Sequence, residues 1–135
     1  KHNLREQVVN DDYMKNYRHI LLELIGKAHR AGVKIVVGVD LGGHAYEPTD
    51  YVRELAVLIE AGLTPMEAIK AATSVLAQML GQAEQFGSLK TGQLADITAV
   101  AANPLNDVSE LERVRFVMSN GKIIRNDFKS STYAL

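Results

Sequence analysis

The longest regular pattern of apolar and polar positions lies near the start of the chain. Between Tyr13 and Ala28, apolar side chains recur at helical spacing and charged side chains occupy the other faces. Gly32 follows the last apolar position, and glycine is common just after a helix because it accepts a positive φ. The pattern predicts a helix that starts near the polar cluster Asn10–Asp12 and stops before Gly32.

A short apolar run follows this predicted helix. Residues 33–39, Val-Lys-Ile-Val-Val-Gly-Val, are mostly β-branched and almost continuously apolar. Such a run is typical of a strand that is buried on both faces, as in parallel sheets and barrels. The run ends directly at Asp40, and α/β enzymes place their chemistry at the carboxyl ends of their strands.

Two further helices are predicted beyond a Gly-rich loop at residues 41–49. Asp50 can cap the first of them. Thr64-Pro-Met-Glu67 has the complete pattern of a capping box with proline at the first helical position, and it predicts a second helix that continues to Gly81. One buried strand cannot form a parallel sheet by itself. We therefore expect this region to belong to a larger barrel, and a compact α+β domain is the alternative.

The chain after Gly81 has the character of a small β-rich unit. Asn120-Gly121 is a typical two-residue hairpin turn, because asparagine and glycine both tolerate positive φ. The strand-like stretches are Leu94–Val100, Arg115–Met118 and Lys122–Arg125. The sequence thus predicts an α/β part at residues 1–81, a β-rich part at 82–126 and a peripheral tail at 127–135.

Composition and charge exclude several classes of function. Hydrophobic residues make up 47% of the 135 residues, and the net charge is −1. This balance is typical of a globular protein and supplies no attraction toward nucleic acid or an anionic membrane. The chain has no cysteine, which excludes disulfides, thiolate nucleophiles and cysteine-based zinc sites. Its apolar runs are far shorter than the roughly 20 residues of a membrane span. We expect neither nucleic acid nor membrane as a partner, and a cytoplasmic location.

Asp40 is the strongest candidate for chemistry. A carboxylate just past a buried strand is costly to desolvate unless it binds a metal, a cation or a substrate donor. It can equally cap the turn that follows it, and the chemistry alone does not separate these readings. His44 lies four residues later on the Gly-rich loop and can contact substrate, although a solvated loop histidine is the simpler interpretation. The other histidines form no His-x-His or His-Glu-x-x-His pattern.

Several segments, taken in order, carry a resemblance to a known family. They are Gly38-Val39-Asp40, Glu60–Thr73, Gly87–Asp96, Asn103–Leu105 and Asn120–Lys122. In combination they resemble the C-terminal region of the amidohydrolase superfamily, which usually has Gly-Thr-Asp or Gly-Ser-Asp at the first of these positions. The resemblance is closest to imidazolonepropionase-like and Xaa-Pro dipeptidase-like enzymes.

The resemblance implies a fold and a site. The fold would be the C-terminal part of a (β/α)8 TIM barrel whose last strand is residues 34–39, followed by half of a small β-sandwich. Asp40 would be a metal ligand and the catalytic residue, and His44 would contact substrate. The cofactor would be a divalent metal, expected to be zinc, as one or two ions. The remaining ligands would lie upstream of residue 1, in a missing N-terminal barrel portion, so the chain alone is expected to be inactive.

The implied function of the parent protein is hydrolysis of a C–N bond in an amide, peptide or cyclic amide by a metal-activated water. Its substrate would be a small molecule or resemble a dipeptide, and homo-oligomerisation is left open. The alternative is a truncated, non-catalytic amidohydrolase-like module that binds or interacts. A complete α+β domain with an accidental resemblance is the third reading.

Overall fold

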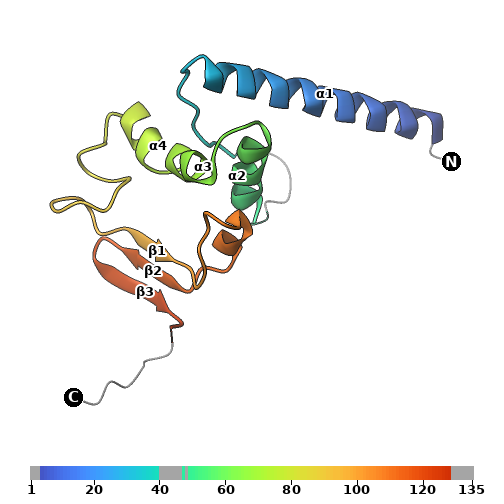
Figure 1. The fold of residues 1–135 in the computed structure, drawn as a ribbon. Coiled ribbons are helices and arrows are strands. Elements are labelled where there is room, and N and C mark those ends of the chain that lie inside the picture. The colour runs from blue at the N-terminus through green and yellow to red at the C-terminus, as the bar shows by residue number, and fades with distance from the viewer. Residues whose placement is uncertain (1–3, 40–46, 48, 129–135) are drawn as a thin grey trace.

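The computed structural model describes residues 4–39, 47 and 49–128 (Figure 1). Within this part, helices precede a small sheet of short strands. The helices are α1 (Leu4–Arg30), α2 (Asp50–Glu60), α3 (Pro65–Ala71) and α4 (Ser74–Met79), and the strands are β1 (Ile97–Ala99), β2 (Phe116–Ser119) and β3 (Lys122–Asn126). A short 3-10 helix, η1 (Val108–Glu112), lies between β1 and β2 in the chain.

Helix α1 is longer than the apolar pattern predicts. It begins at Leu4 and runs through Asn10–Asp12, so the prediction that this polar cluster starts the helix is wrong. Asparagine and aspartate cost a few tenths of a kcal/mol each inside a helix, which does not interrupt it. The predicted end is confirmed, because Gly32 follows Arg30 closely and has a φ of +81°. Figure 1 shows the amino-terminal half of α1 extending beyond the other helices.

The carboxyl-terminal half of α1 contacts the end of α2. Arg18 donates from both terminal nitrogens to the Glu60 carboxylate, at 2.7 and 2.5 Å. This hydrogen-bonded pairing lowers the pKa of Glu60 and raises the pKa of Arg18. Gly26 allows the close approach of the two helices, because a Cβ atom there would lie 2.5 Å from the Ala61 carbonyl oxygen. Because Gly26 has no side chain, α1 can pack closely against the end of α2.

Residues 33–39 do not form the predicted strand. In the part of the chain that the structure describes, they have no regular secondary structure, and the sheet contains only β1, β2 and β3. A strand requires a neighbouring strand to accept and donate its backbone hydrogen bonds. The Val37 N–H instead donates to the Ala71 carbonyl oxygen of α3, at 3.2 Å. The apolar character of the run is nevertheless used, because Val37 is buried.

The core forms where residues 33–39, α2 and α3 meet. Its buried members are Val37, Leu55, Leu58, Leu63, Ala68 and Ala71. Val108 and Leu111 of η1 pack against this cluster, so the segment after Gly81 contributes to the same core as the helices. Burying a leucine side chain stabilises a fold by about 1.5–3 kcal/mol. The predicted boundary between residues 1–81 and 82–126 stays a prediction.

The predicted capping box is confirmed at the start of α3. The Glu67 N–H donates to the Thr64 hydroxyl at 3.2 Å, and the Thr64 N–H donates to the Glu67 carboxylate at 2.8 Å. The helix that it starts does not continue to Gly81 as predicted. It ends at Ala71, and α4 starts at Ser74 after an interruption at Thr73, where φ is −132° and ψ is −94°. The predicted helix is therefore two short helices.

The three predicted strands are confirmed with shorter or slightly shifted bounds. They form an antiparallel sheet in the order β1-β2-β3. The hairpin between β2 and β3 turns at Asn120 and Gly121, whose φ values are +48° and +76°. Asp96 holds this turn, because its carboxylate accepts from the Asn120 N–H at 2.6 Å and from the Ser119 hydroxyl at 3.0 Å. The Asn-Gly turn thus sets the register of the hairpin, as its sequence predicts.

Large apolar side chains remain exposed on α1, on β3 and in the loops. Examples are Tyr13 at 63%, Leu24 at 55%, Leu89 at 80% and Ile124 at 62%. Contiguous exposed apolar surface is typical of a contact with further protein. The described residues form a helical unit followed by a small antiparallel sheet, and both carry exposed apolar side chains. No helix in this part of the chain has the length and apolarity needed to cross a membrane.

Gly87 offers a direct test of the packing on α4. A Cβ atom there would lie 2.6 Å from the Ala77 Cβ atom, and the φ of Gly87 is +94°. We expect Gly87→Ala to lower the free energy of unfolding by about 1–3 kcal/mol through overpacking, with strain from the positive φ in addition. Thermal unfolding of the purified protein measures the change.

Gly38→Ala is the matched control, because a Cβ atom at Gly38 has nothing within 4 Å. Equal melting temperatures for Gly87→Ala and the wild type would contradict the close contact.

Candidate active site

The predicted site residues Asp40 and His44 lie outside the described residues. The chain that leads to them and the chain that follows them are both described. The described segments on either side give the points at which the chain enters and leaves the residues between them.

The segment before Asp40 is held against α3. Val37 is 5% exposed and packs in the core, and its N–H donates to the Ala71 carbonyl oxygen. Ile35 is half-buried and packs against the same cluster. Alternate side chains of this segment thus fix the chain to within three residues of Asp40.

The segment after the loop is held by the first turn of α2. The Asp50 carboxylate accepts from the Glu47 N–H at 3.0 Å and from the Arg53 guanidinium at 2.8 Å. The helix starts at Asp50 itself and Thr49 takes the cap position, so the prediction that Asp50 caps this helix is wrong. The hydroxyl of the next residue, Tyr51, donates to the Ala72 carbonyl oxygen at 3.4 Å. Sequence reasoning missed Tyr51, since a tyrosine at the start of a helix has no distinguishing pattern.

The described residues do not form a metal centre by themselves. No group of three or more His, Cys, Asp or Glu side chains among them could hold a metal ion. His29 lies 3.7 Å from Glu67, and the hollow beside His19 contains Glu23 and Glu60, but neither arrangement supplies a ligand set. A metal ion at Asp40 would therefore need ligands from beyond this part of the chain.

A hollow of about 150 Å³ lies beside His29 and Glu67, at the amino end of residues 33–39. Hydrogen bonds from the Thr64 N–H and hydroxyl lower the pKa of Glu67, and the charges of His29 and Lys70 add to this effect. In barrel enzymes the chemistry lies at the carboxyl ends of the strands, and the opposite face serves stability. The His29–Glu67 contact lies at the beginning of residues 33–39, away from Asp40 in the chain.

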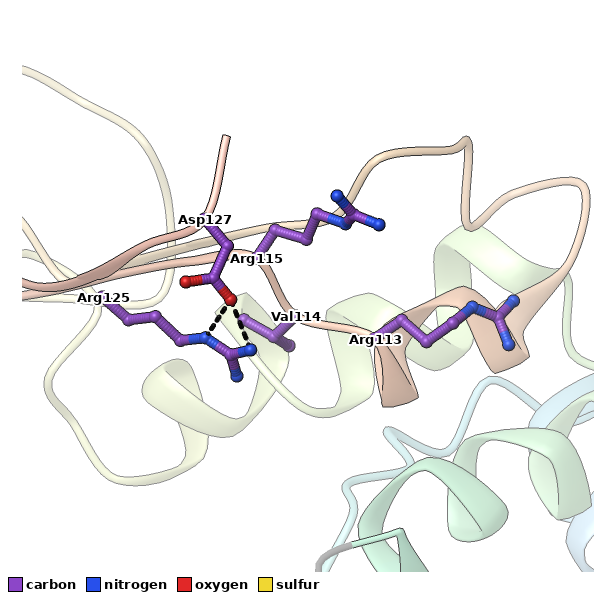
Figure 2. A pocket seen from close by; sticks show the side chains of 5 residues that line it. All are labelled: Arg113, Val114, Arg115, Arg125 and Asp127. Carbon is purple, nitrogen blue, oxygen red and sulfur yellow. Dashed lines mark hydrogen bonds and ion pairs between the residues drawn. The ribbon is translucent and has the colours of Figure 1, made fainter. Parts of the chain in front are cut away.

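A third hollow, of about 400 Å³, lies at the end of the sheet and has three arginines in its lining (Figure 2). Arg125 contacts the Asp127 carboxylate through two nitrogens, at 2.6 and 2.5 Å. Arg113 pairs with Glu110 at 2.5 Å, and this pairing raises the pKa of Arg113. Arg115 points away from the Arg125–Asp127 pair. Guanidinium groups stay protonated at all working pH values, so this lining offers no general base apart from an already paired carboxylate.

A profile of the amidohydrolase family matches residues 20–124, which is more than half of the chain. The chain belongs to the amidohydrolase family. The resemblance found from Asp40 and the segments after it is thereby confirmed. The amidohydrolase family is generally metal-dependent.

Individual amidohydrolases show the same similarity in sequence and in structure. The ochratoxinase of Aspergillus niger is 35% identical over 125 residues, which cover 88% of this chain and 23% of that protein. Its crystal structure matches 78% of this chain and 24% of its own, with a TM-score of 0.68 and 33% identity. A crystal structure of a Xaa-Pro dipeptidase with bound methionine in the active site matches 78% of this chain and 25% of its own, with a TM-score of 0.71 and 34% identity.

The chain spans about a quarter of the length of these hydrolases. It therefore corresponds to one portion of an amidohydrolase, and Asp40 falls inside the matched residues 20–124.

The Glu67 capping carboxylate makes a pH-dependent contribution that can be measured. Its pKa is lowered below the model-compound value of 4.5, so its stabilising effect is present above about pH 4.5 and is lost as the pH falls through the folded-state pKa. We expect Glu67→Gln to lower the melting temperature at about pH 7, and the difference from the wild type to shrink toward about pH 3.

Glu84→Gln is the control, since Glu84 is exposed and makes no hydrogen bond or ion pair with the described residues. A difference between Glu67→Gln and the wild type that stays constant from neutral to acidic pH would contradict the role of the carboxylate.

Proposed function

We propose that this chain is the C-terminal portion of an enzyme that hydrolyses a C–N bond in an amide, a peptide or a cyclic amide. The observation that carries the proposal is the match to the amidohydrolase family over residues 20–124. The relatives with similar sequence and structure are named as hydrolases, which supports the same class of reaction.

The proposal includes the fold of the complete protein. Residues 34–39 would be the last strand of a (β/α)8 barrel, and residues 82–126, with strands β1 to β3, would be part of a composite β-sandwich. Two observations support this arrangement. Residues 33–39 are apolar yet have no strand partner among the described residues, and large apolar side chains on α1 and β3 are exposed. Additional barrel strands would pair with residues 33–39. Additional barrel strands and helices would cover the apolar side chains on α1 and β3.

Asp40 would carry the proton transfer. A bound divalent cation, expected to be zinc, would lower the pKa of a water molecule to near 7. We propose that Asp40 is one ligand of this cation and that its carboxylate accepts the proton as the water oxygen attacks the carbonyl carbon. Asp40 then returns the proton to the leaving nitrogen as the C–N bond breaks. The position of Asp40 three residues after buried Val37 supports this role, because a rigid support is required for proton transfer.

The substrate would be a small molecule or resemble a dipeptide. The names of the relatives, Xaa-Pro dipeptidase and ochratoxinase, support a compact substrate. His44, on the loop after Asp40, would contact this substrate and orient the scissile bond.

The second candidate function is a non-catalytic amidohydrolase-like module that binds a partner. The exposed apolar side chains of α1 and β3 favour it as much as they favour a complete barrel, because either a partner or the rest of a barrel would cover them. The coding sequence upstream of Lys1 separates the two. A His-x-His motif there supports the enzyme, and a start codon next to Lys1 supports the module.

Replacement of Asp40 tests the proposed reaction. In the full-length protein, Asp40→Asn preserves shape and removes the ionisable oxygen, so we expect kcat to fall by about 10²–10⁴-fold. Steady-state kinetics with an amide substrate measure kcat. Mass spectrometry separately measures the metal content of the purified protein.

Asp127→Asn is the matched control, because Asp127 pairs with Arg125 at the exposed hollow by the sheet. A kcat near the wild-type value for Asp40→Asn would remove this residue from the mechanism.

His44 is tested by its effect on substrate binding. We expect His44→Ala in the full-length protein to raise KM by about tenfold and to change kcat little, because a lost contact that is equal in the ground and transition states affects KM alone. His19→Ala, on α1, is the control. A loss in kcat at constant KM would instead place His44 in the chemical step.

A further inference from the structure

The interruption between α3 and α4 holds the chain on both sides of residues 40–48. On the earlier side, the Val37 N–H donates to the Ala71 carbonyl oxygen at 3.2 Å. On the later side, the Tyr51 hydroxyl donates to the Ala72 carbonyl oxygen at 3.4 Å. The two acceptors are consecutive residues. Segments that are fourteen positions apart in the chain are thus attached to adjacent carbonyls.

These carbonyls are available because the helix is interrupted at this point. In a continuous α-helix, the carbonyls of residues 71 and 72 would accept from the N–H groups four positions later. Since α3 ends at Ala71 and α4 starts at Ser74, their oxygens can accept from elsewhere. The interruption therefore creates a pair of acceptors on the surface of α3 that faces Val37 and Tyr51.

Two local contacts stabilise the interruption. The Thr73 hydroxyl donates to the Ile69 carbonyl oxygen at 2.8 Å, a contact that bends helices. Gly87 lies against the Thr73 carbonyl and Ser74, where a Cβ atom would lie 3.0 and 3.2 Å from the Thr73 oxygen and the Ser74 Cα atom. The end of α3 and the start of α4 are thus held by the Thr73–Ile69 hydrogen bond and by Gly87 in the loop that follows α4.

We infer that Tyr51 is a positioning residue for the proposed hydrolysis, which acts by holding the start of α2 to the interruption beside the Val37–Ala71 hydrogen bond. Tyr51 is half-buried against the core, so its ring is held as well as its hydroxyl. The inference rests on the proposed function, in which Asp40 performs the proton transfer. Catalysis depends steeply on position, since a displacement of about 1 Å can cost about a hundredfold in rate.

The first experiment is Tyr51→Phe in the full-length protein. This variant keeps the packed ring and removes the hydroxyl. We expect kcat to fall by about tenfold to a hundredfold, with KM within about twofold of the wild type and the melting temperature within a few degrees. Tyr13→Phe is the matched control, because Tyr13 lies on α1, stacks on Tyr17 and is distant in sequence from the interruption. It should leave kcat and KM unchanged.

A second pair of variants tests the interruption without changing Tyr51. Thr73→Val removes the hydroxyl that bonds to Ile69, and Thr73→Ser keeps it. We expect Thr73→Val to lower kcat at nearly constant KM and Thr73→Ser to retain the wild-type kcat. If Thr73 had a purely structural role, Thr73→Val would lower the melting temperature without lowering kcat at nearly constant KM.

The outcomes separate the inference from the proposed function. If Asp40→Asn is inactive while Tyr51→Phe and Thr73→Val both retain the wild-type kcat, the proposed function stands and the positioning role is overturned. If Tyr51→Phe fails to fold, the Thr73 pair decides. If Asp40→Asn is nearly as active as the wild type, Asp40 is removed from the mechanism and this inference is overturned with it.

Discussion

The contact of Val37 with the alanine face of α3 is the constraint on which the helical unit depends. Ala68 and Ala71 are almost completely buried, and their small side chains allow the backbone of residues 33–39 to approach the helix closely. The approach brings the Val37 N–H within hydrogen-bonding distance of the Ala71 carbonyl. A buried N–H without a partner would cost about 1–3 kcal/mol, so this bond replaces the ladder that a strand would have supplied. Leu55 and Leu58 of α2 then close the same cluster.

Surface charge pairs contribute less to this arrangement than the apolar core does. Arg18–Glu60 connects α1 to α2, and Arg125–Asp127 lies at the end of the sheet, but the side chains of both pairs are about half exposed. Exposed pairs of this kind contribute little to stability, because water and salt screen their attraction. They orient neighbouring elements, whereas the leucines and alanines at the centre hold them. Ile35 and Val37 of residues 33–39 are held by this same core.

Several segments of this chain have the apolar composition of buried elements but lack the cover or the strand pairing of such elements among the described residues. The apolar side chains on α1 and β3 and the unpaired segment 33–39 are the visible signs. The side chains on α1 and β3 have the composition of a buried element and the exposure of a surface one, whereas residues 33–39 are packed against the core but have no strand partner among the described residues. Val37 packs in a core shared with α2 and α3, so the region that precedes Asp40 is held although it has no neighbouring strand among the described residues.

Local chemistry in the sequence determined the features whose hydrogen-bonding partners lie within a few residues. The capping box of Thr64 and Glu67 and the hairpin turn at Asn120-Gly121 are of this kind, and both were predicted correctly. The ordered segments from Gly38 to Lys122 were also sufficient to indicate the amidohydrolase family and Asp40 as its candidate catalytic residue.

Tertiary structure decided the features whose partners are distant in the chain. The interruption at Thr73 has no signal among its neighbours, because alanines and a threonine are all compatible with a continuous helix, and Gly87 packs against it from a later loop. Residues 33–39 have the composition of a strand, but pairing needs a neighbouring strand, so the described chain uses a helix carbonyl instead. The contact of Tyr51 with Ala72 likewise depends on how α2 and α3 pack, which no local pattern encodes.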